Sequence, residues 1–457
     1  MHIDIIKDKK FEIITFLIFF SFFFQSIIEV NDSLSYIENS YKRPFLYPLI
    51  INIFEFIFSD YFKRPLIIFQ LLLGYFGLTY FLKFFFKKFK IKSFIFKVIL
   101  FFSISYPYFN LSMKIGNSIL SESLAYPIFL IFTIFFIKSI FGNKNYLKNF
   151  LLSLIFFSLL VLRKKTFLIL VPVYFLSLVV ELIFTKELKK AIISIFLVFF
   201  TFFSLSLIEK GATFIKYGTF STISVSGSSL VSGPFYLAKE DDFKKIKGDL
   251  NKKIINNALK ILKENNIERI KRNHNSNNDI LSFVKDTRRT FHDYFNKYVI
   301  IQSIFEDNVE DVFTKKDLQN YKYKNISSQH TTDIAIQLIK LNPVENLYFY
   351  ITNVIYGMGG YFISNNELNG YYANIGFSGL FILIFQILIF IISLTALFQK
   401  TKHKLLAKIC LLFILINFTN ISAVAMYQPV YDRFSFFSFQ LIFFISSFVL
   451  IKFFEDK

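Results

Sequence analysis

Long apolar runs alternate along this chain with short polar connections that are rich in lysine. A run of about 20 apolar residues is long enough to cross a bilayer as a helix, because a helix satisfies its own backbone hydrogen bonds within hydrocarbon. The pattern predicts about ten transmembrane helices, at Phe11–Val30, Pro65–Phe86, Ser93–Asn110, Ser123–Phe141, Leu147–Leu162, Phe167–Phe184, Ala191–Ile208, Ile375–Phe398, Leu405–Ala425 and Phe434–Phe454.

Two further apolar segments do not fit this rule. Pro44–Asp60 is short and is interrupted by Asn52 and Glu55, and Leu347–Ile363 is interrupted by glycines. Segments of this kind lie in the plane of the membrane–water boundary with one face in the lipid. We therefore expect two interfacial helices, one early and one late in the chain.

Residues 209–346 form the one long polar stretch, which is rich in asparagine and lysine and has helical patterns at Asp241–Glu264 and Asp279–Ile301. The expected fold is an all-α integral membrane protein with interfacial helices and a mostly helical extracytoplasmic region. Residues 1–208 are expected to form a membrane module of about seven transmembrane helices, with its first outer loop at residues 31–64. Residues 347–457 are expected to supply an interfacial helix and about three more transmembrane helices.

The composition supports this class. Hydrophobic residues make up 54% of the 457 residues, and the mean hydropathy of +0.50 exceeds what a soluble domain needs. Much of the formal net charge of +20 is carried by lysines in short connections, so we attribute it to membrane orientation and anionic lipid, not to nucleic acid. The single cysteine, Cys410, excludes a disulfide framework and a thiolate metal site.

The charges also predict an orientation. Lysine-rich segments follow every second predicted helix, and basic residues are retained on the cytoplasmic side, so the N-terminus lies inside and the polar region outside. Lys7, Lys9 and Lys10 precede an apolar run that is too long for a cleavable signal, and we interpret this run as an anchor. We expect a multi-pass protein of the bacterial inner (plasma) membrane with its active site facing the outside or periplasm.

All eight arginines fall on the expected outer side, whereas the inner connections use lysine alone. Lysine is enough to set orientation, but the planar guanidinium of arginine grips phosphate through two hydrogen bonds. Arg163 and Arg433 stand next to membrane helices, at the depth of a lipid phosphate, and are candidates for phosphate binding. Exposed basic residues near head groups are common, so simple contact with lipid is the alternative.

Four carboxylates are expected at the same face: Asp32, Glu38, Glu122 and Asp432. A carboxylate there is able to act as a general base or to bind a divalent cation. A solvated helix end is the simpler interpretation of Glu38, and Glu122 fits the first turn of a helix, where the dipole favours an acid. The histidines lack metal-ligand spacing, so we predict no metal ligands. No nucleotide-binding glycine motif is present, which argues against nucleotide-driven transport.

Four stretches together resemble the GT-C superfamily of glycosyltransferases, which use polyprenyl-phosphate sugars and include protein O-mannosyltransferases and the lipid A aminoarabinose transferase. The matching positions are Asp32, Tyr36, Arg43, Pro44, Tyr47 and Pro48 of the first outer loop, Ile119–Leu124, Leu162-Arg163 with Pro172, and Tyr431–Phe434. The first loop has Asn31-Asp32 where the mannosyltransferases have Asp-Glu, and Phe434 stands where tyrosine is usual. The order of these four stretches, and the side of the membrane on which they are expected, match the pattern of the family across nearly the whole chain.

The resemblance implies an inverting sugar transfer at the outer face. Asp32 would deprotonate the acceptor hydroxyl, with Glu122 as a second catalytic carboxylate. The residues implied to neutralise the lipid phosphate of the donor are Arg163, Lys164, Arg433 and Arg43. The residues implied to line the cleft are Tyr36, Tyr47 and Asp432, with the polar region shaping its acceptor side. No cofactor is required, although a divalent cation is compatible with the scheme.

The expected partners are a polyprenyl-phosphate-sugar donor, a glycan, lipid or protein acceptor, and membrane lipids, with no nucleic acid. A polysaccharide polymerase or ligase is an alternative in the same class, and it would use a pyrophosphate-linked oligosaccharide donor. A flippase or transporter is the alternative from another class. Transporters have internal repeats and charged or broken helices near the midplane, and the sequence shows no visible repeat and little midplane charge.

Overall fold

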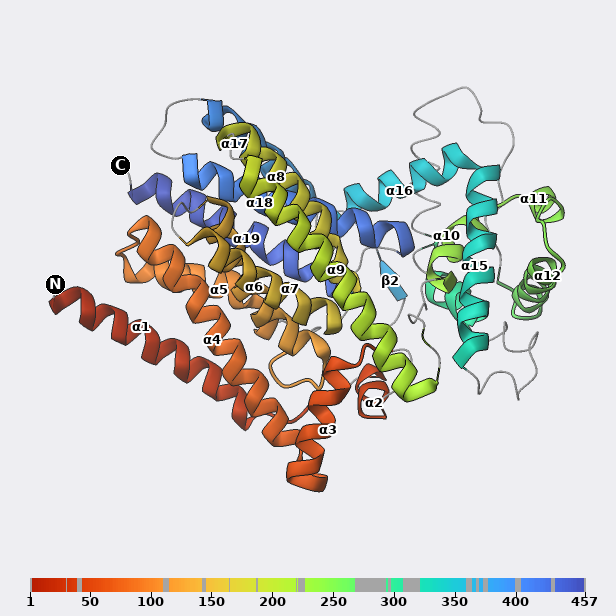
Figure 1. Ribbon diagram of the computed structural model, residues 1–457, viewed down its shortest axis with the longest axis horizontal. Helices are drawn as coiled ribbons and strands as arrows, with labels where there is room; N and C mark the ends of the chain where they lie inside the picture. The colour runs from red at the N-terminus through yellow and green to blue at the C-terminus, as the bar shows by residue number, and fades with distance from the viewer. Residues whose placement is uncertain are drawn as a thin grey trace. The chain divides into compact units, whose positions relative to one another are not determined.

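The computed structural model is dominated by α-helices over the residues that it describes (Figure 1). This confirms the all-α fold class in its coarse form. Within those residues, strands occur only as a short antiparallel pair, β1 (Ser364–Asn366) and β2 (Gly370–Tyr372). The described residues are 2–29, 31–38, 43–109, 115–141, 145–163, 165–185, 188–218, 220, 227–267, 293–294, 297–306, 321–358, 364–366, 370–372, 377–398, 404–428 and 432–455.

The chain divides into two compact units. Unit 1 comprises Met1–Ala212, Phe385–Thr419 and Phe436–Lys457, and unit 2 comprises Thr213–Ile384 and Asn420–Ser435. Unit 1 therefore combines N-terminal and C-terminal segments of the sequence in one body.

Unit 1 is a bundle of apolar helices. Its N-terminal elements are α1 (His2–Ser21), η1 (Phe22–Phe24), α2 (Asn31–Ile37), α3 (Leu46–Phe58), η2 (Ser59–Tyr61), α4 (Lys63–Phe89), α5 (Phe94–Phe109), α6 (Ser121–Phe141), α7 (Tyr146–Arg163), η3 (Lys165–Ile169) and α8 (Leu170–Thr185). The helices α9 (Leu188–Tyr217), α17 (Phe377–Phe398), α18 (Lys404–Tyr427) and α19 (Asp432–Glu455) belong to it for most of their length.

Among the described residues, five helices are long and apolar enough to cross a membrane. They are Lys63–Phe89, Ser121–Phe141, Tyr146–Arg163, Leu188–Lys216 and Lys404–Tyr427. Shorter apolar helices of 10–17 residues lie at Phe94–Phe109, Thr166–Val179, Ile382–Leu397 and Phe437–Phe453. These helices fit a membrane protein, while the count of ten remains a prediction.

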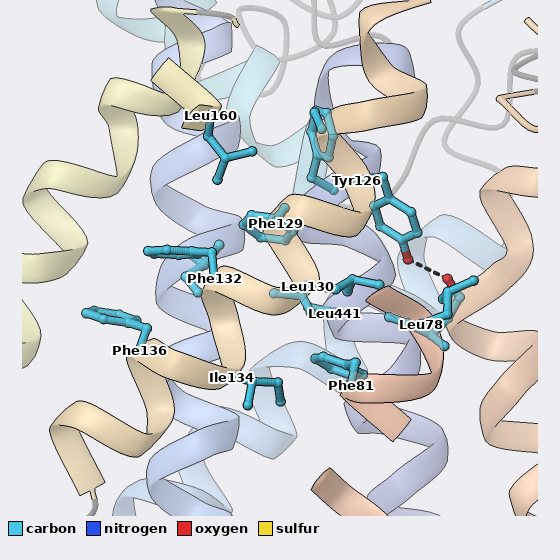
Figure 2. Packing of buried hydrophobic residues seen from close by; sticks show 14 of the residues in the cluster. Leu78, Phe81, Tyr126, Phe129, Leu130, Phe132, Ile134, Phe136, Leu160 and Leu441 are labelled. Atoms are coloured by element: carbon cyan, nitrogen blue, oxygen red, sulfur yellow. Dashed lines mark hydrogen bonds between the residues drawn. The ribbon is translucent and has the colours of Figure 1, made fainter. Parts of the chain in front are cut away.

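Helix α6 lies at the centre of the core of unit 1, packed against α4 and α7. Figure 2 shows Phe129, Phe132 and Phe136 of α6 among side chains from α4, α7 and α19. Gly77 of α4 lies so close to Pro127 of α6 that a Cβ atom added to it would stand 2.7 Å from the Pro127 Cβ. The absence of a side chain at position 77 therefore permits the close crossing of these two helices.

The first predicted transmembrane helix, Phe11–Val30, is wrong at both ends. Helix α1 begins at His2 and ends at Ser21, and a single 3-10 turn follows to Phe24. Further along, Ile28 pairs with the segment before α6, since its N–H donates to Asn117 O at 3.0 Å and its carbonyl accepts from Ile119 N at 3.2 Å. The chain leaves the helix early because these extended residues find backbone partners in another part of unit 1.

Unit 2 is a smaller helical assembly, with α10 (Gly227–Leu237), α11 (Glu240–Lys244), α12 (Asp249–Glu264), α15 (Tyr321–Leu341) and α16 (Pro343–Met358). Helix α10 packs on α15 and α16, and α12 packs on α15. The predicted helical pattern Asp241–Glu264 is split into α11 and α12, while most of the pattern Asp279–Ile301 lies outside the described residues. The predicted interfacial helix Leu347–Ile363 corresponds to α16, which begins and ends earlier.

Candidate functional site

The connection between α1 and α3 carries an ion pair between Arg43 and Asp32. The Nη2 group of Arg43 donates to Asp32 Oδ1, and its Nε donates to Ser35 Oγ at 2.7 Å. The guanidinium carbon also lies 4.5 Å from the centre of the Tyr36 ring, within the range of a cation–π contact. The two charged side chains remain 23% and 27% exposed, so both are accessible to a ligand.

Short helix α2 positions these groups. Asp32 lies in its first turn, where a carboxylate is favoured by the helix dipole. The Ser35 hydroxyl donates to the Asp32 carbonyl at 2.7 Å, and the buried Ser33 hydroxyl donates to Ile119 O at 2.9 Å. The second bond ties α2 to the turn before α6, although the two are far apart in sequence.

Two buried tyrosines connect α2 with α3 and α4. The rings of Tyr36 and Tyr47 meet edge to face, with their centres 5.0 Å apart. Gln70 of α4 donates from Nε2 to the Tyr47 hydroxyl at 2.7 Å. The Tyr36 hydroxyl shares a hydrogen bond of 2.6 Å with Ser121 Oγ at the start of α6. Tyr36 thus links the Arg43–Asp32 pair to the N-terminus of the central helix.

Glu122 occupies the first turn of α6 and is fully buried. Its Oε2 accepts a hydrogen bond of 3.0 Å from the Ser121 hydroxyl. The turn before it is fixed by Ser123, whose hydroxyl donates to Ile115 O at 2.7 Å and to Ser118 O at 3.1 Å. The first-turn position predicted for Glu122 is confirmed, and its burial distinguishes it from Glu38, which is exposed as a solvated helix end would be.

Arg163 is the last residue of α7 and is only 1% exposed. Its guanidinium carbon lies 5.5 Å from the ring centre of Phe167 and 5.9 Å from that of Phe437. A guanidinium enclosed by aromatic faces in this way is held in one place and is largely desolvated.

The charges of Glu122, Arg43 and Arg163 all act on the pKa of the Tyr36 phenol. Burial is the main cause that raises this pKa, and the charge of Glu122 raises it further. The charges of Arg43 and Arg163 and the hydrogen bond to Ser121 act in the opposite direction. Tyr36 therefore stays neutral at physiological pH, and two arginines and a buried carboxylate lie near enough to influence its hydroxyl.

The structure does not describe the side chains of the three remaining predicted site residues, Lys164, Asp432 and Arg433. Lys164 lies outside the described residues. Asp432 and Arg433 form the start of the α19 backbone and belong to unit 2, and the structure does not describe their side chains. In the part of the chain that is described, no group of three or more histidine, cysteine, aspartate or glutamate side chains is arranged to hold a metal ion.

The site also contains polar residues that the sequence did not single out. Ser35 and Ser121 each bond a predicted site residue, and Gln70 bonds Tyr47. The only available signal was that Ser35 and Ser121 stand next to Tyr36 and Glu122 in the sequence. Gln70 gave a weaker one, as a polar residue inside an apolar run.

Comparison with protein-family models, curated proteins and solved structures found no match to this chain. Its function is inferred from the chemistry of its own residues. The partly exposed Asp32 carboxylate is able to accept a proton, and the adjacent guanidinium of Arg43 is able to bind a phosphate.

Proposed function

We propose that this protein is an integral membrane glycosyltransferase. It transfers a sugar from a polyprenyl-phosphate donor to an envelope glycan or lipid acceptor at the extracytoplasmic face of the bacterial plasma membrane. The observation that carries the proposal is that Asp32 and Arg43 are paired beside Tyr36, which hydrogen bonds connect to Ser121 and Glu122 within a bundle of apolar helices. The charge of the buried Arg163 also acts on the Tyr36 phenol. A purely structural bundle does not require two arginines and two carboxylates at one location, because each costs free energy to remove from water.

Three of these charged groups, Asp32, Arg43 and Arg163, act directly in the proposed transfer. The acceptor hydroxyl attacks the anomeric carbon from the face opposite the leaving group, while Asp32 takes the hydroxyl proton. The bond between the anomeric carbon and the phosphate oxygen breaks, and its electron pair leaves with the lipid phosphate. Arg43 and Arg163 stabilise the negative charge that develops on that phosphate. The proposal does not require a divalent cation, because the two guanidinium groups supply positive charge.

Substitution of the proposed base is the direct test. We expect Asp32→Asn to lower sugar transfer from a polyprenyl-phosphate donor by about 100-fold or more, the usual contribution of a general base. Glu38→Gln is the matched control, since Glu38 is an exposed carboxylate at the end of the same helix. Transfer is measured with purified protein in lipid, and the folded state is checked by thermal denaturation. Undiminished transfer by Asp32→Asn would exclude Asp32 as the base.

The donor that the protein accepts, and what happens to that donor, distinguish the proposed glycosyltransferase from the alternative functions. A polymerase or ligase would accept a pyrophosphate-linked oligosaccharide and leave a single sugar on a monophosphate untouched. A flippase would move a labelled lipid across the bilayer with no change in its covalent structure. Either result would replace the proposed sugar transfer.

A further inference from the structure

Within the described residues, three different contacts hold Arg43, and they are not equivalent. Two of them, the hydrogen bond to Ser35 Oγ at 2.7 Å and the stacking on the Tyr36 ring at 4.5 Å, involve uncharged groups. The third is the ion pair with the Asp32 carboxylate. An anionic ligand is able to replace only the third contact, because the first two do not supply negative charge.

The ion pair also limits Asp32 as a base. A carboxylate that accepts a hydrogen bond from a guanidinium is stabilised in its charged form and is a weaker proton acceptor than a free one. In the geometry described, the proposed base is therefore engaged by a residue that belongs to the same site.

We propose that the Asp32 carboxylate occupies the anion-binding position of Arg43 until the donor phosphate displaces it, so that the base becomes available only after the donor has bound. This inference rests on the proposed function. Arg43 keeps its place through Ser35 and Tyr36, while the Asp32 side chain rotates away toward the acceptor. The exchange moves the Asp32 side chain, while the Asp32 backbone carbonyl remains bonded to the Ser35 hydroxyl.

The chemistry of the two anions favours the exchange. The phosphate diester of a lipid-linked sugar presents two non-bridging oxygens, which match the parallel N–H groups of a guanidinium. The existing pair is partly exposed, and exposed ion pairs are weak enough to be broken by a better ligand. A donor that binds first would also reduce wasteful hydrolysis, since no base would be free to activate water at an empty site.

A double-mutant cycle with an isoprenoid phosphate tests the exchange. The probe is farnesyl phosphate, and farnesol, which lacks the phosphate, is the control ligand. The dissociation constant is measured for the full-length protein in detergent and for Asp32→Asn, Arg43→Gln, the double variant and Glu38→Gln. Thermal denaturation of each variant establishes that it is folded.

We expect Asp32→Asn to bind farnesyl phosphate about fivefold more tightly than the wild type, because the phosphate no longer competes with a carboxylate for Arg43. Arg43→Gln should bind it at least about tenfold more weakly. The double variant should bind like Arg43→Gln, since the gain requires Arg43, and Glu38→Gln should bind like the wild type. Ser35→Ala should weaken binding severalfold, because it removes one of the two contacts that keep Arg43 in position.

Three results would overturn the exchange. If Asp32→Asn binds farnesyl phosphate no more tightly than the wild type, competition between the carboxylate and the phosphate is excluded. A gain that persists in the Arg43→Gln background would show a simple loss of repulsion between two anions. If the wild type binds farnesyl phosphate no better than farnesol, the proposed function fails together with the exchange, whereas the first two results leave the proposed function intact.

Discussion

At the scale of single residues, Glu122 is the most demanding group of the site. A carboxylate with no exposed surface is costly unless its surroundings stabilise it. The N-terminus of α6 and the Ser121 hydroxyl both do so. This position suits a charge that must be present near Tyr36 without contact with water.

Two substitutions of Glu122 separate the contribution of its charge to sugar transfer from the contribution of its volume to stability. We expect Glu122→Ala to lower the free energy of unfolding by about 2 kcal/mol, because it leaves a cavity and removes the acceptor of the Ser121 bond. Glu122→Gln keeps the shape and an acceptor oxygen, so the fold should persist while sugar transfer falls by about tenfold or more. Thermal unfolding in detergent and the transfer rate are the measurements. Full transfer by Glu122→Gln would restrict Glu122 to a structural role.

The sequence indicated the charged groups of the site but not how they are held. Residue type and the expected side of the membrane singled out Asp32, Glu122 and Arg163 as candidates, and the family resemblance added Arg43. Sequence position could not show that Arg163 is enclosed by Phe167 and Phe437, because Phe437 lies about 270 residues further along the chain. Nor could it show the serine bonds, which depend on the close approach of α2 to the start of α6.

At the scale of helices, α3 differs from the simple amphipathic helix that its sequence suggested. Tyr47, Pro48 and Ile51 face the core. The opposite side is also apolar, with Leu49, Ile53, Phe56 and Ile57 exposed, and Phe56 is 90% exposed. Asn52 and Glu55 form only a narrow polar strip between the two apolar sides. Periodicity in a segment of 13 residues could not distinguish one apolar face from two.

We expect the exposed side of α3 to lie in lipid, because α3 packs on the transmembrane candidate α4, with the ring centres of Phe54 and Phe69 5.5 Å apart. A cysteine at Phe56, labelled with an environment-sensitive fluorophore in a Cys410→Ser background, should emit at shorter wavelength in vesicles. Spin-labelled lipids should quench it. The matched label at Asp60, an exposed acid in the following turn, should report water. Equal emission from both sites would place α3 outside the bilayer.

The crossing of α4 and α6 predicts a second result at this scale. Gly77→Ala adds one Cβ atom that would stand 2.7 Å from the Pro127 Cβ and 2.9 Å from its carbonyl oxygen. We expect a loss of stability of about 1–3 kcal/mol, the usual cost of overpacking. Gly211→Ala in α9 is the matched control, since no atom lies within 4 Å of its added Cβ. Thermal denaturation in detergent compares the two, and equal stability would contradict a tight crossing.

At the scale of the whole molecule, hydropathy predicted the order of the helices well and their ends less well. The helices α4, α5, α6 and α7 begin and end within a few residues of the predicted runs, because apolar length alone defines a helix in lipid. Helix α1 ends early and α9 runs to Tyr217, nine residues past the predicted end. Those ends depend on partners and on polar turns that hydropathy does not detect.

The sidedness of the chain is the prediction on which the proposed function most depends. Three exposed residues can report on this orientation. Glu38 directly follows α2, Lys148 lies in α7, and Lys263 lies in α12. Cysteines placed there one at a time in a Cys410→Ser background should react differently with a membrane-impermeant maleimide. Thiols at Glu38 and Lys263 should react in intact cells, since the candidate site and the polar region are expected outside. The thiol at Lys148 should react only after permeabilisation. If the cysteines at positions 148 and 263 react from the same side, the predicted orientation is wrong. An extracytoplasmic acceptor would then lack access to Asp32.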